Sequence, residues 1–255
     1  MKITAMDREN LLGNQFSNAY AMSIENNLLY SRIERILMMT KEKTILHVGC
    51  CDHIPLIKGK IENGTWLQGL LDKNCKQVVG VDINQEAVNY VNENGLSSQA
   101  VYCADITSED LFDVIPKIQY DYVLLGEVVE HLDNPVSFLS AIRKSLLQHD
   151  IHSKCIITVP NAFSLLKYKL KNNHMTELIN SDHRYWFTPY TICKVLTMSG
   201  LTPTELFFAS CGAGGNGRNR MSEKFFRRLE RIRKRPSSWH SFVGDQIIVE
   251  AELNF

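Results

Sequence analysis

The sequence predicts an α/β fold in which a doubly wound, mostly parallel sheet of seven strands carries helices on both faces. Three observations predict it. Short apolar runs alternate with segments of helical periodicity along most of the chain. The apolar runs have the length of strands and stop at Gly, Asp or Pro-Asn. The chain of 255 residues is long enough to bury one large core, and no repeat or low-complexity linker divides it.

In chain order, the central elements are predicted from their apolar runs and from the turn residues between them. The expected strands are Thr44–Val48, Gln77–Val81 (ending on Asp82), Ala100–Cys103, Tyr120–Leu125 and Lys154–Thr158. A helix is expected over Gln85–Glu93, stopping near Gly95, and another over Pro135–Leu147, where apolar residues recur at helical spacing.

The two ends of the chain are expected to extend this core. Residues 1–40 are predicted to form a helical cap on the edge of the main domain, residues 41–255. Residues 161–181 are polar and basic, which indicates an insertion over the sheet. A helix over Thr188–Met198 and two last strands, Glu205–Ser210 and Asp245–Leu253, complete the fold, with a basic insertion at 217–240 between those strands.

Composition and charge favour a soluble cytoplasmic protein. The apolar share is 44%, and 28 basic residues balance 28 acidic ones. The N-terminus lacks the apolar segment of a signal peptide, and the apolar runs fall far short of the ~20 residues of a membrane span. Seven scattered cysteines without a CxxC pair indicate reduced thiols and argue against a zinc ribbon.

Gly49 and Asp82 are the first candidate site residues, because each directly follows or ends a strand. Ligands of doubly wound sheets bind beyond the carboxyl ends of the strands. A glycine there admits a ligand close to the backbone, and a carboxylate can accept hydrogen bonds from both ribose hydroxyls. Each residue alone is equally typical of a turn or a cap. Together, with Asp105 after the third strand, they favour a nucleoside pocket.

The loop at residues 49–53 (GCCDH) argues against a dinucleotide. A dinucleotide fingerprint needs three glycines, so that the pyrophosphate can lie at a helix N-terminus. This loop has one, and Asp52 would repel a pyrophosphate while tolerating the cationic sulfonium and ammonium of S-adenosylmethionine.

At this point the sequence resembles the class I methyltransferases, which have a Rossmann-like fold, over about residues 42–210. It looks closest to a branch found in bacterial polysaccharide biosynthesis. The resemblance rests on ILHVGCCDH (45–53), VVGVDINQEAV (78–88), ADI (104–106), YDYVLLGEVVEHLDNP (120–135), ITVPNAFSLLKY (157–168) and DHRYWFTPYTICKVLTMSGL (182–201).

This resemblance implies S-adenosyl-L-methionine as the cofactor, S-adenosyl-L-homocysteine as the product, and a role for each matching residue. The Gly49 loop, with Cys50 and Asp52, would hold the methionine part, and Asp82 would hold the ribose. Ile83, Asp105 and Ile106 would surround the adenine, and Gly126 and Glu127 would lie near the sulfur. His47 departs from the family pattern, which usually has an acidic residue there.

The segment Glu127-Val128-Val129-Glu130-His131 holds the candidate catalytic residues, His131 and Glu130. On a helix these carboxylates and the imidazole would share one face. Three readings stay open. In the first, His131 acts as a general base toward a hydroxyl acceptor. In the second, Glu127, Glu130, His131 and His183 bind a divalent metal, which is not the expected case. In the third, Glu130 and His131 are structural. Small-RNA 3′-terminal 2′-O-methyltransferases and ubiquinone-biosynthesis O-methyltransferases carry a similar EVxEH segment, and the former use such ligands for a metal.

Residues Arg218–Arg235 contain nine basic and two acidic residues, and their apolar residues fall on one helical face. The pattern predicts an amphipathic basic helix that either packs on the sheet or contacts an anionic acceptor or membrane surface. Aromatic residues are not interleaved, so the nucleic-acid signal is weak.

The combined expectation is an O-methyltransferase that acts on a sugar hydroxyl of a surface polysaccharide or another glycan. Tyr168, Tyr185, Trp186 and Phe187 would roof the acceptor pocket. The alternatives are a metal-dependent RNA 2′-O-methyltransferase and a non-catalytic cofactor-binding protein that uses the basic helix as an anchor.

Overall fold

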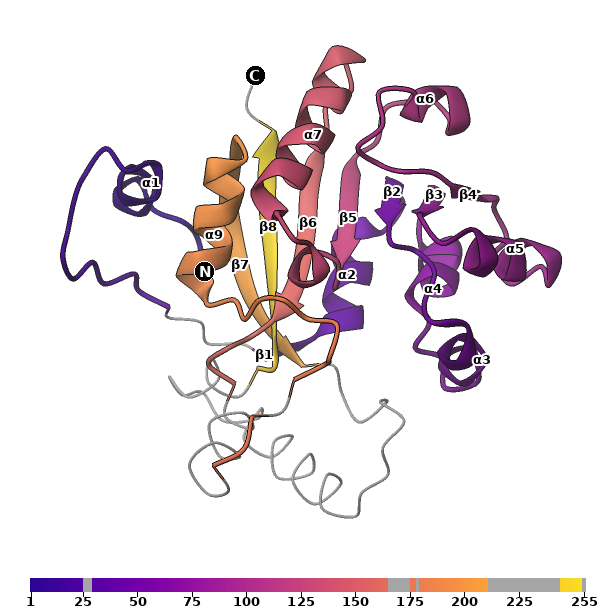
Figure 1. Cartoon of the computed structure of the whole chain (residues 1–255), viewed down its shortest axis with the longest axis horizontal. Coiled ribbons are helices and arrows are strands. Elements are labelled where there is room, and N and C mark those ends of the chain that lie inside the picture. The colour runs from indigo at the N-terminus through magenta and orange to yellow at the C-terminus, as the bar shows by residue number, and fades with distance from the viewer. Residues whose placement is uncertain (25–28, 165–174, 178, 211–243, 254–255) are drawn as a thin grey trace.

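The structure, a computed structural model, describes residues 1–24, 29–164, 175–177, 179–210 and 244–253 (Figure 1). They form one sheet in the order β1-β7-β8-β6-β5-β2-β3-β4. The strands are β1 (Leu29–Ser31), β2 (Thr44–Val48), β3 (Gln77–Asp82), β4 (Val101–Cys103), β5 (Tyr122–Gly126), β6 (Lys154–Pro160), β7 (Leu201–Ser210) and β8 (Gln246–Leu253). The described helices are α1 (Ala5–Leu12), α2 (Arg32–Thr40), α3 (Ile54–Glu62), α4 (Leu67–Asn74), α5 (Gln85–Glu93), α6 (Leu111–Val114), η1 (Val129–His131), α7 (Pro135–Gln148) and α9 (Pro189–Met198).

The doubly wound, mostly parallel sheet is confirmed, with eight strands in place of the expected seven. Only β8 runs antiparallel to its neighbours, β6 and β7. The additional strand is β1, which pairs in parallel with the end of β7, Leu29 opposite Phe208. It lies inside the segment expected to be helical, because three residues are too few to show a strand periodicity. The division into residues 1–40 and 41–255 stays a prediction, and the basic segment 217–240 lies outside the described residues.

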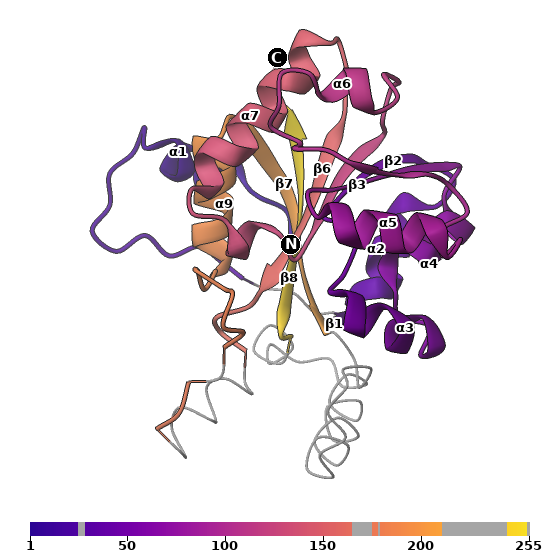
Figure 2. The same cartoon turned by 45° about the vertical axis from the view of Figure 1, so that its right-hand side comes forward.

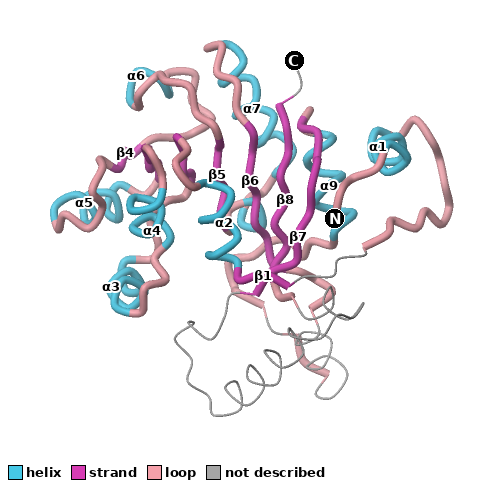
Figure 3. The backbone as a smooth tube through the Cα atoms, turned by 180° about the vertical axis from the view of Figure 1, so that it is seen from behind, coloured by secondary structure: helices cyan, strands magenta, loops and turns pink. Residues whose placement is uncertain are grey.

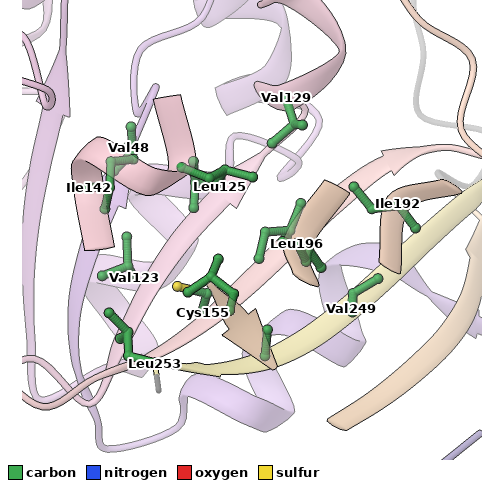
Figure 4. Packing of buried hydrophobic residues seen from close by; sticks show 14 of the residues in the cluster. Val48, Val123, Leu125, Val129, Ile142, Cys155, Ile192, Leu196, Val249 and Leu253 are labelled. Atoms are coloured by element: carbon green, nitrogen blue, oxygen red, sulfur yellow. The ribbon is translucent and has the colours of Figure 1, made fainter. Parts of the chain in front are cut away.

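Helices cover both faces of the sheet because side chains alternate along each strand. On β5, Val123 and Leu125 face one core with Ile142 of α7 and Leu196 of α9 (Figure 4). Figure 2 shows α7 and α9 together on this face of the sheet. Leu124, between them, faces the opposite core. Figure 3 shows α2 and α4 on that side, where Ile36 and Leu71 are fully buried.

The strand order reverses between β5 and β2, which are neighbours although β3 and β4 follow β2 in the chain. Beyond this point the carboxyl ends of β2, β3 and β5 lie together, the usual ligand position in such sheets. The six cysteines in the described ranges are free thiols, as expected. Among the described helices, none combines the length and apolarity that crossing a bilayer requires.

Candidate active site

A cavity of about 400 Å³ lies at the carboxyl ends of β2, β3 and β5. Its volume is within the range of about 300–1,000 Å³ typical of small-molecule sites. Its walls include eight of the candidate site residues from the sequence: Gly49, Cys50, Asp52, Asp82, Gly126, Glu127, His131 and His183. The fold therefore brings the loop after β2, the end of β3 and the segment after β5 to one place.

Gly49 begins the loop after β2 with a φ of +67°, a conformation that side chains disfavour. A Cβ at this position would also lie 2.7 Å from Cγ2 of Val128. The amide of Gly49 donates to the carbonyl of Val81 (2.9 Å), so the loop is held against β3. Glycine is thus required here for two independent reasons, backbone conformation and space.

Asp82 is tied to the same loop. Its Oδ2 accepts a hydrogen bond of 2.9 Å from the amide of Cys51, and its Oδ1 accepts one of 3.0 Å from the amide of Asn84. Burial raises the pKa of Asp82, while these amides act in the opposite direction. The carboxylate is therefore partly dehydrated and fixed in position, and its remaining lone pairs can accept hydrogen bonds from a ligand.

Asp52, two residues before α3, pairs with Lys60 of that helix, and its Oδ1 accepts a hydrogen bond of 3.0 Å from the amide of His53. The negative charge expected to tolerate a sulfonium is therefore partly compensated by a lysine that also lines the cavity.

Three predicted cofactor residues lie outside the residues that line the cavity. Ile83, next to Asp82, exposes 75% of its surface. Asp105 is exposed, and its Oδ1 accepts hydrogen bonds from the amide and hydroxyl of Thr107. The side chain of Ile106 is 5% exposed and belongs to the main core, so only its backbone can face a ligand.

The expectation that Glu127, Glu130 and His131 share a helical face is wrong. Glu127 has a φ of +61°, which turns the chain before the short 3₁₀ helix η1 begins. Its Oε1 accepts a hydrogen bond of 3.0 Å from Thr158 and lies 3.9 Å from Nε of Arg32. Glu127 therefore belongs to a different contact network from the other two residues.

Glu130, His131 and His183 do come together. One ligand atom from each lies within 4.8 Å of the other two. Nε2 of His183 is 3.9 Å from Oε1 of Glu130, and the two imidazole rings are perpendicular with centroids 4.6 Å apart. Glu130 is fully buried. The amide of Arg184 donates to the carbonyl of Glu130 (2.8 Å), which holds the backbone at Arg184 against η1.

Arg32, the first residue of α2, is a site residue that the sequence analysis missed. It lines the cavity, and its Nε donates a hydrogen bond of 3.1 Å to Oγ1 of Thr158. Its guanidinium group is a suitable partner for a carboxylate ligand. Nothing in the linear sequence distinguishes this arginine from others, because α2 reaches the cavity only through its packing on the sheet.

His47 also lines the cavity, from inside β2. Burial lowers its pKa to about 4, so the ring is neutral at pH 7. Its Nδ1 lies 2.8 Å from Oε1 of Gln68, and this hydrogen bond acts against the shift. The residue that departs from the family pattern is therefore an uncharged, hydrogen-bonded wall of the site.

A sequence profile described as a methyltransferase domain matches residues 61–206, more than half of the chain. The protein belongs to this methyltransferase family. It is an enzyme that uses S-adenosylmethionine as methyl donor. The expectation of a non-catalytic anchor is not supported. No curated protein matches the chain.

Solved structures of methyltransferases share the fold at low sequence identity. A S-adenosylmethionine-dependent methyltransferase of Archaeoglobus fulgidus is 19% identical (TM-score 0.50; 87% of this chain, 91% of the other). A methyltransferase in complex with the Haloferax volcanii Trm112 activator is 13% identical, with a TM-score of 0.53 over 87% of this chain and 88% of the other. A Thermotoga maritima protein described as a possible histamine N-methyltransferase is 10% identical, with a TM-score of 0.52 over 88% of each chain. These likenesses concern the fold.

The cavity fits this methyl donor. Gly49 leaves room where a side chain would collide with Val128, and Asp82 offers a half-buried carboxylate. Arg32 offers a cation in the cavity wall, with Nη2 2.9 Å from the position that a Cβ on Gly126 would take.

Proposed function

We propose that the enzyme is an O-methyltransferase that acts on a sugar hydroxyl in a surface polysaccharide or another glycan, with His131 as the general base. The observation that carries this proposal is the position of His131. Its imidazole lines the cavity that also contains Gly49 and Asp82. A proton acceptor beside the methyl donor is what a hydroxyl acceptor requires, because its oxygen must lose a proton during transfer.

In this proposal each part of the cofactor has a partner in the cavity. Asp82 binds the ribose hydroxyls, and the loop from Gly49 to Asp52 holds the methionine part. Arg32 pairs with the methionine carboxylate. Ile83 and the Ile106 backbone bound the adenine, with Asp105 at the exposed edge of that part of the site. Gly126 and Glu127 form the floor near the sulfur. The cofactor, when bound, supplies an electrophilic methyl group.

The protein's own contribution is alignment and proton removal. The fixed loop and the half-buried carboxylate of Asp82 set the direction of approach, and alignment of this kind is worth several orders of magnitude in the rate of a displacement reaction. His131 takes the proton of the acceptor hydroxyl. Glu130 and His183 position its ring: Glu130 is fully buried with a carboxylate oxygen within 4.8 Å of a ring nitrogen of His131, and the His183 ring packs perpendicular to that of His131 with centroids 4.6 Å apart.

A sugar acceptor is supported by the surroundings of His183. The Trp186 ring lies 6.3 Å from that of His183, and Tyr185 is partly exposed, its hydroxyl donating to the carbonyl of Asp133 (2.8 Å). Aromatic faces of this kind stack on sugar rings. An anionic glycan or membrane would in addition suit the basic segment Arg218–Arg235, which lies outside the described residues.

The test is transfer of a labelled methyl group to a panel of sugars, nucleotide sugars and short RNAs. We expect a glycan to be labelled. His131→Ala should lose at least 100-fold in rate and keep its affinity for S-adenosylhomocysteine, whereas His152→Ala, on the surface, should behave as the parent. Normal turnover by His131→Ala would refute the assigned base.

A metal-dependent RNA 2′-O-methyltransferase is the second candidate, and one observation favours it. Glu130, His131 and His183 offer a carboxylate and two imidazoles within 4.8 Å, a donor set that fits Mg²⁺, Mn²⁺ or Zn²⁺. Such an ion would polarise the acceptor oxygens. This candidate differs from the first in that chelator should abolish activity, added divalent cation should restore it, and RNA rather than glycan should be labelled.

A further inference from the structure

Two adjacent cysteines and an aspartate form a second group of ligand atoms, separate from the histidines. Sγ of Cys50 and Sγ of Cys51 are 3.9 Å apart, and one carboxylate oxygen of Asp82 lies within 4.8 Å of both. All three residues line the cofactor cavity. The mechanism proposed above uses the carboxylate of Asp82 and the backbone of the loop, which leaves the two thiol groups themselves without a role.

The spacing of the two thiols matches that of a metal site. Zinc binds thiolates at about 2.3 Å in tetrahedral geometry, which sets two coordinated sulfurs about 3.8 Å apart. The observed 3.9 Å differs from this by about 0.1 Å. A third, oxygen ligand from Asp82 needs only a side-chain adjustment, because its oxygens already lie at the same mouth of the cavity.

The backbone holds these ligands in place. The amides of Gly49 and Cys50 both donate to the carbonyl of Val81, at 2.9 and 3.2 Å, and the amide of Cys51 donates to Oδ2 of Asp82. The thiol of Cys50 packs against Gly80, where an added Cβ would lie 2.9 Å from the sulfur. A site of this kind loses little conformational entropy on binding, because its donors are already ordered.

We propose that Cys50, Cys51 and Asp82 bind a thiophilic divalent cation such as Zn²⁺, and that this cation excludes the cofactor. Binding releases the two thiol protons to solvent and leaves the fourth tetrahedral position to water. The ion excludes the cofactor because it occupies the carboxylate of Asp82, which we assigned to the ribose. This exclusion rests on the proposed role of Asp82. The site thus makes the enzyme sensitive to free zinc or cadmium.

Direct binding is tested with Cd²⁺, whose thiolate complexes absorb in the near ultraviolet. The full chain, kept reduced with a phosphine, is titrated with Cd²⁺. We expect a charge-transfer band that saturates at one equivalent, is lost in Cys51→Ser and Cys50→Ser, and persists in Cys75→Ser and His183→Ala. Cys75 lies after α4, away from the cavity lining, and is the matched control for a half-buried thiol. A band that persists in Cys51→Ser, or no band in the parent, overturns the proposal.

Exclusion of the cofactor is tested by titrating S-adenosylhomocysteine at several free Zn²⁺ concentrations. Relative to each variant's own value without zinc, the apparent Kd should rise in proportion to free Zn²⁺ in the parent, in Cys75→Ser and in His183→Ala, and stay constant in Cys51→Ser. A thermal unfolding midpoint close to that of the parent shows that Cys51→Ser is folded. If the cadmium band forms and the apparent Kd does not rise, exclusion is refuted. If Asp82→Asn also leaves cofactor affinity intact, the assignment of the ribose to Asp82 fails separately.

Discussion

Nε of Arg32 donates a hydrogen bond of 3.1 Å to Oγ1 of Thr158, a residue 126 positions away in the sequence. This hydrogen bond joins the start of α2 to β6. The hydroxyl of Thr158 in turn donates to Oε1 of Glu127, which lies 3.9 Å from Nε of Arg32. The N-terminal segment therefore covers the sheet and also contributes to the cavity in which we propose that the cofactor binds. The guanidinium keeps donors beyond Nε for a ligand carboxylate.

Replacing Arg32 should discriminate between parts of the cofactor. Arg32→Met should weaken binding of S-adenosylhomocysteine by about 10- to 100-fold, the loss expected for a charge-assisted hydrogen bond. Methylthioadenosine lacks the amino acid, so its affinity should change by less than about 3-fold. Calorimetric titration of both ligands checks this. Lys41→Met, an exposed cation after α2, is the control, and an equal loss for both ligands would count against the carboxylate contact.

The sequence predicted best those elements whose burial pattern is clear. The bounds of β2 and α5 agree with the expected ones residue for residue, since β2 is buried along its whole length and α5 follows the Asn84 cap and buries one apolar face. Helices α3 and α4 were not predicted, because Gly59 and Gly69 and short lengths weaken their periodicity. Both helices contribute residues to the wall of the cavity.

The candidate site was predictable where it depends on strand ends, and not where it depends on packing or on backbone conformation. Gly49 and Asp82 follow from the fold class alone. Arg32 enters from an element distant in sequence. The left-handed φ of Glu127 cannot be read from its residue type, since it is uncommon for glutamate, and it separates Glu127 from Glu130 and His131.

Gly49 and Gly64 form a matched pair: both have φ near +65°, but only Gly49 lacks space for a Cβ atom. Gly64→Ala should cost about 1 kcal/mol of unfolding free energy, the price of the backbone conformation. Gly49→Ala adds a contact of 2.7 Å with Val128 and should cost about 2–4 kcal/mol. Urea denaturation measures both. Similar losses in the two variants would show that the loop after β2 relaxes freely.

Two strand-end carboxylates should differ sharply in cofactor binding. Asp82 lines the cavity, whereas Asp105 is exposed and hydrogen-bonded to Thr107. Asp82→Asn should reduce affinity for S-adenosylhomocysteine and for adenosine alike by about 10- to 100-fold, because both ligands carry the ribose. Asp105→Asn should change either by less than about 3-fold. Fluorescence or calorimetric titration measures both affinities. A larger loss in Asp105→Asn than in Asp82→Asn would place the ribose near the end of β4.

His47 should make the fold sensitive to acid. Burial lowers its pKa to about 4 in the folded state, below the value near 6.5 of an unfolded chain. The unfolded state therefore binds a proton first as the pH falls. The stability associated with the neutral ring is complete above about pH 6.5 and is lost as the pH falls toward 4, by up to about 3 kcal/mol.

His47→Gln, which keeps a polar group beside Gln68, removes this titration. Its unfolding free energy, measured in urea from pH 7 to 4.5, should fall less steeply than that of the parent. The control His152→Gln, at an exposed position, should follow the parent. Parallel curves for His47→Gln and the parent would mean that the buried ring is not the group that titrates.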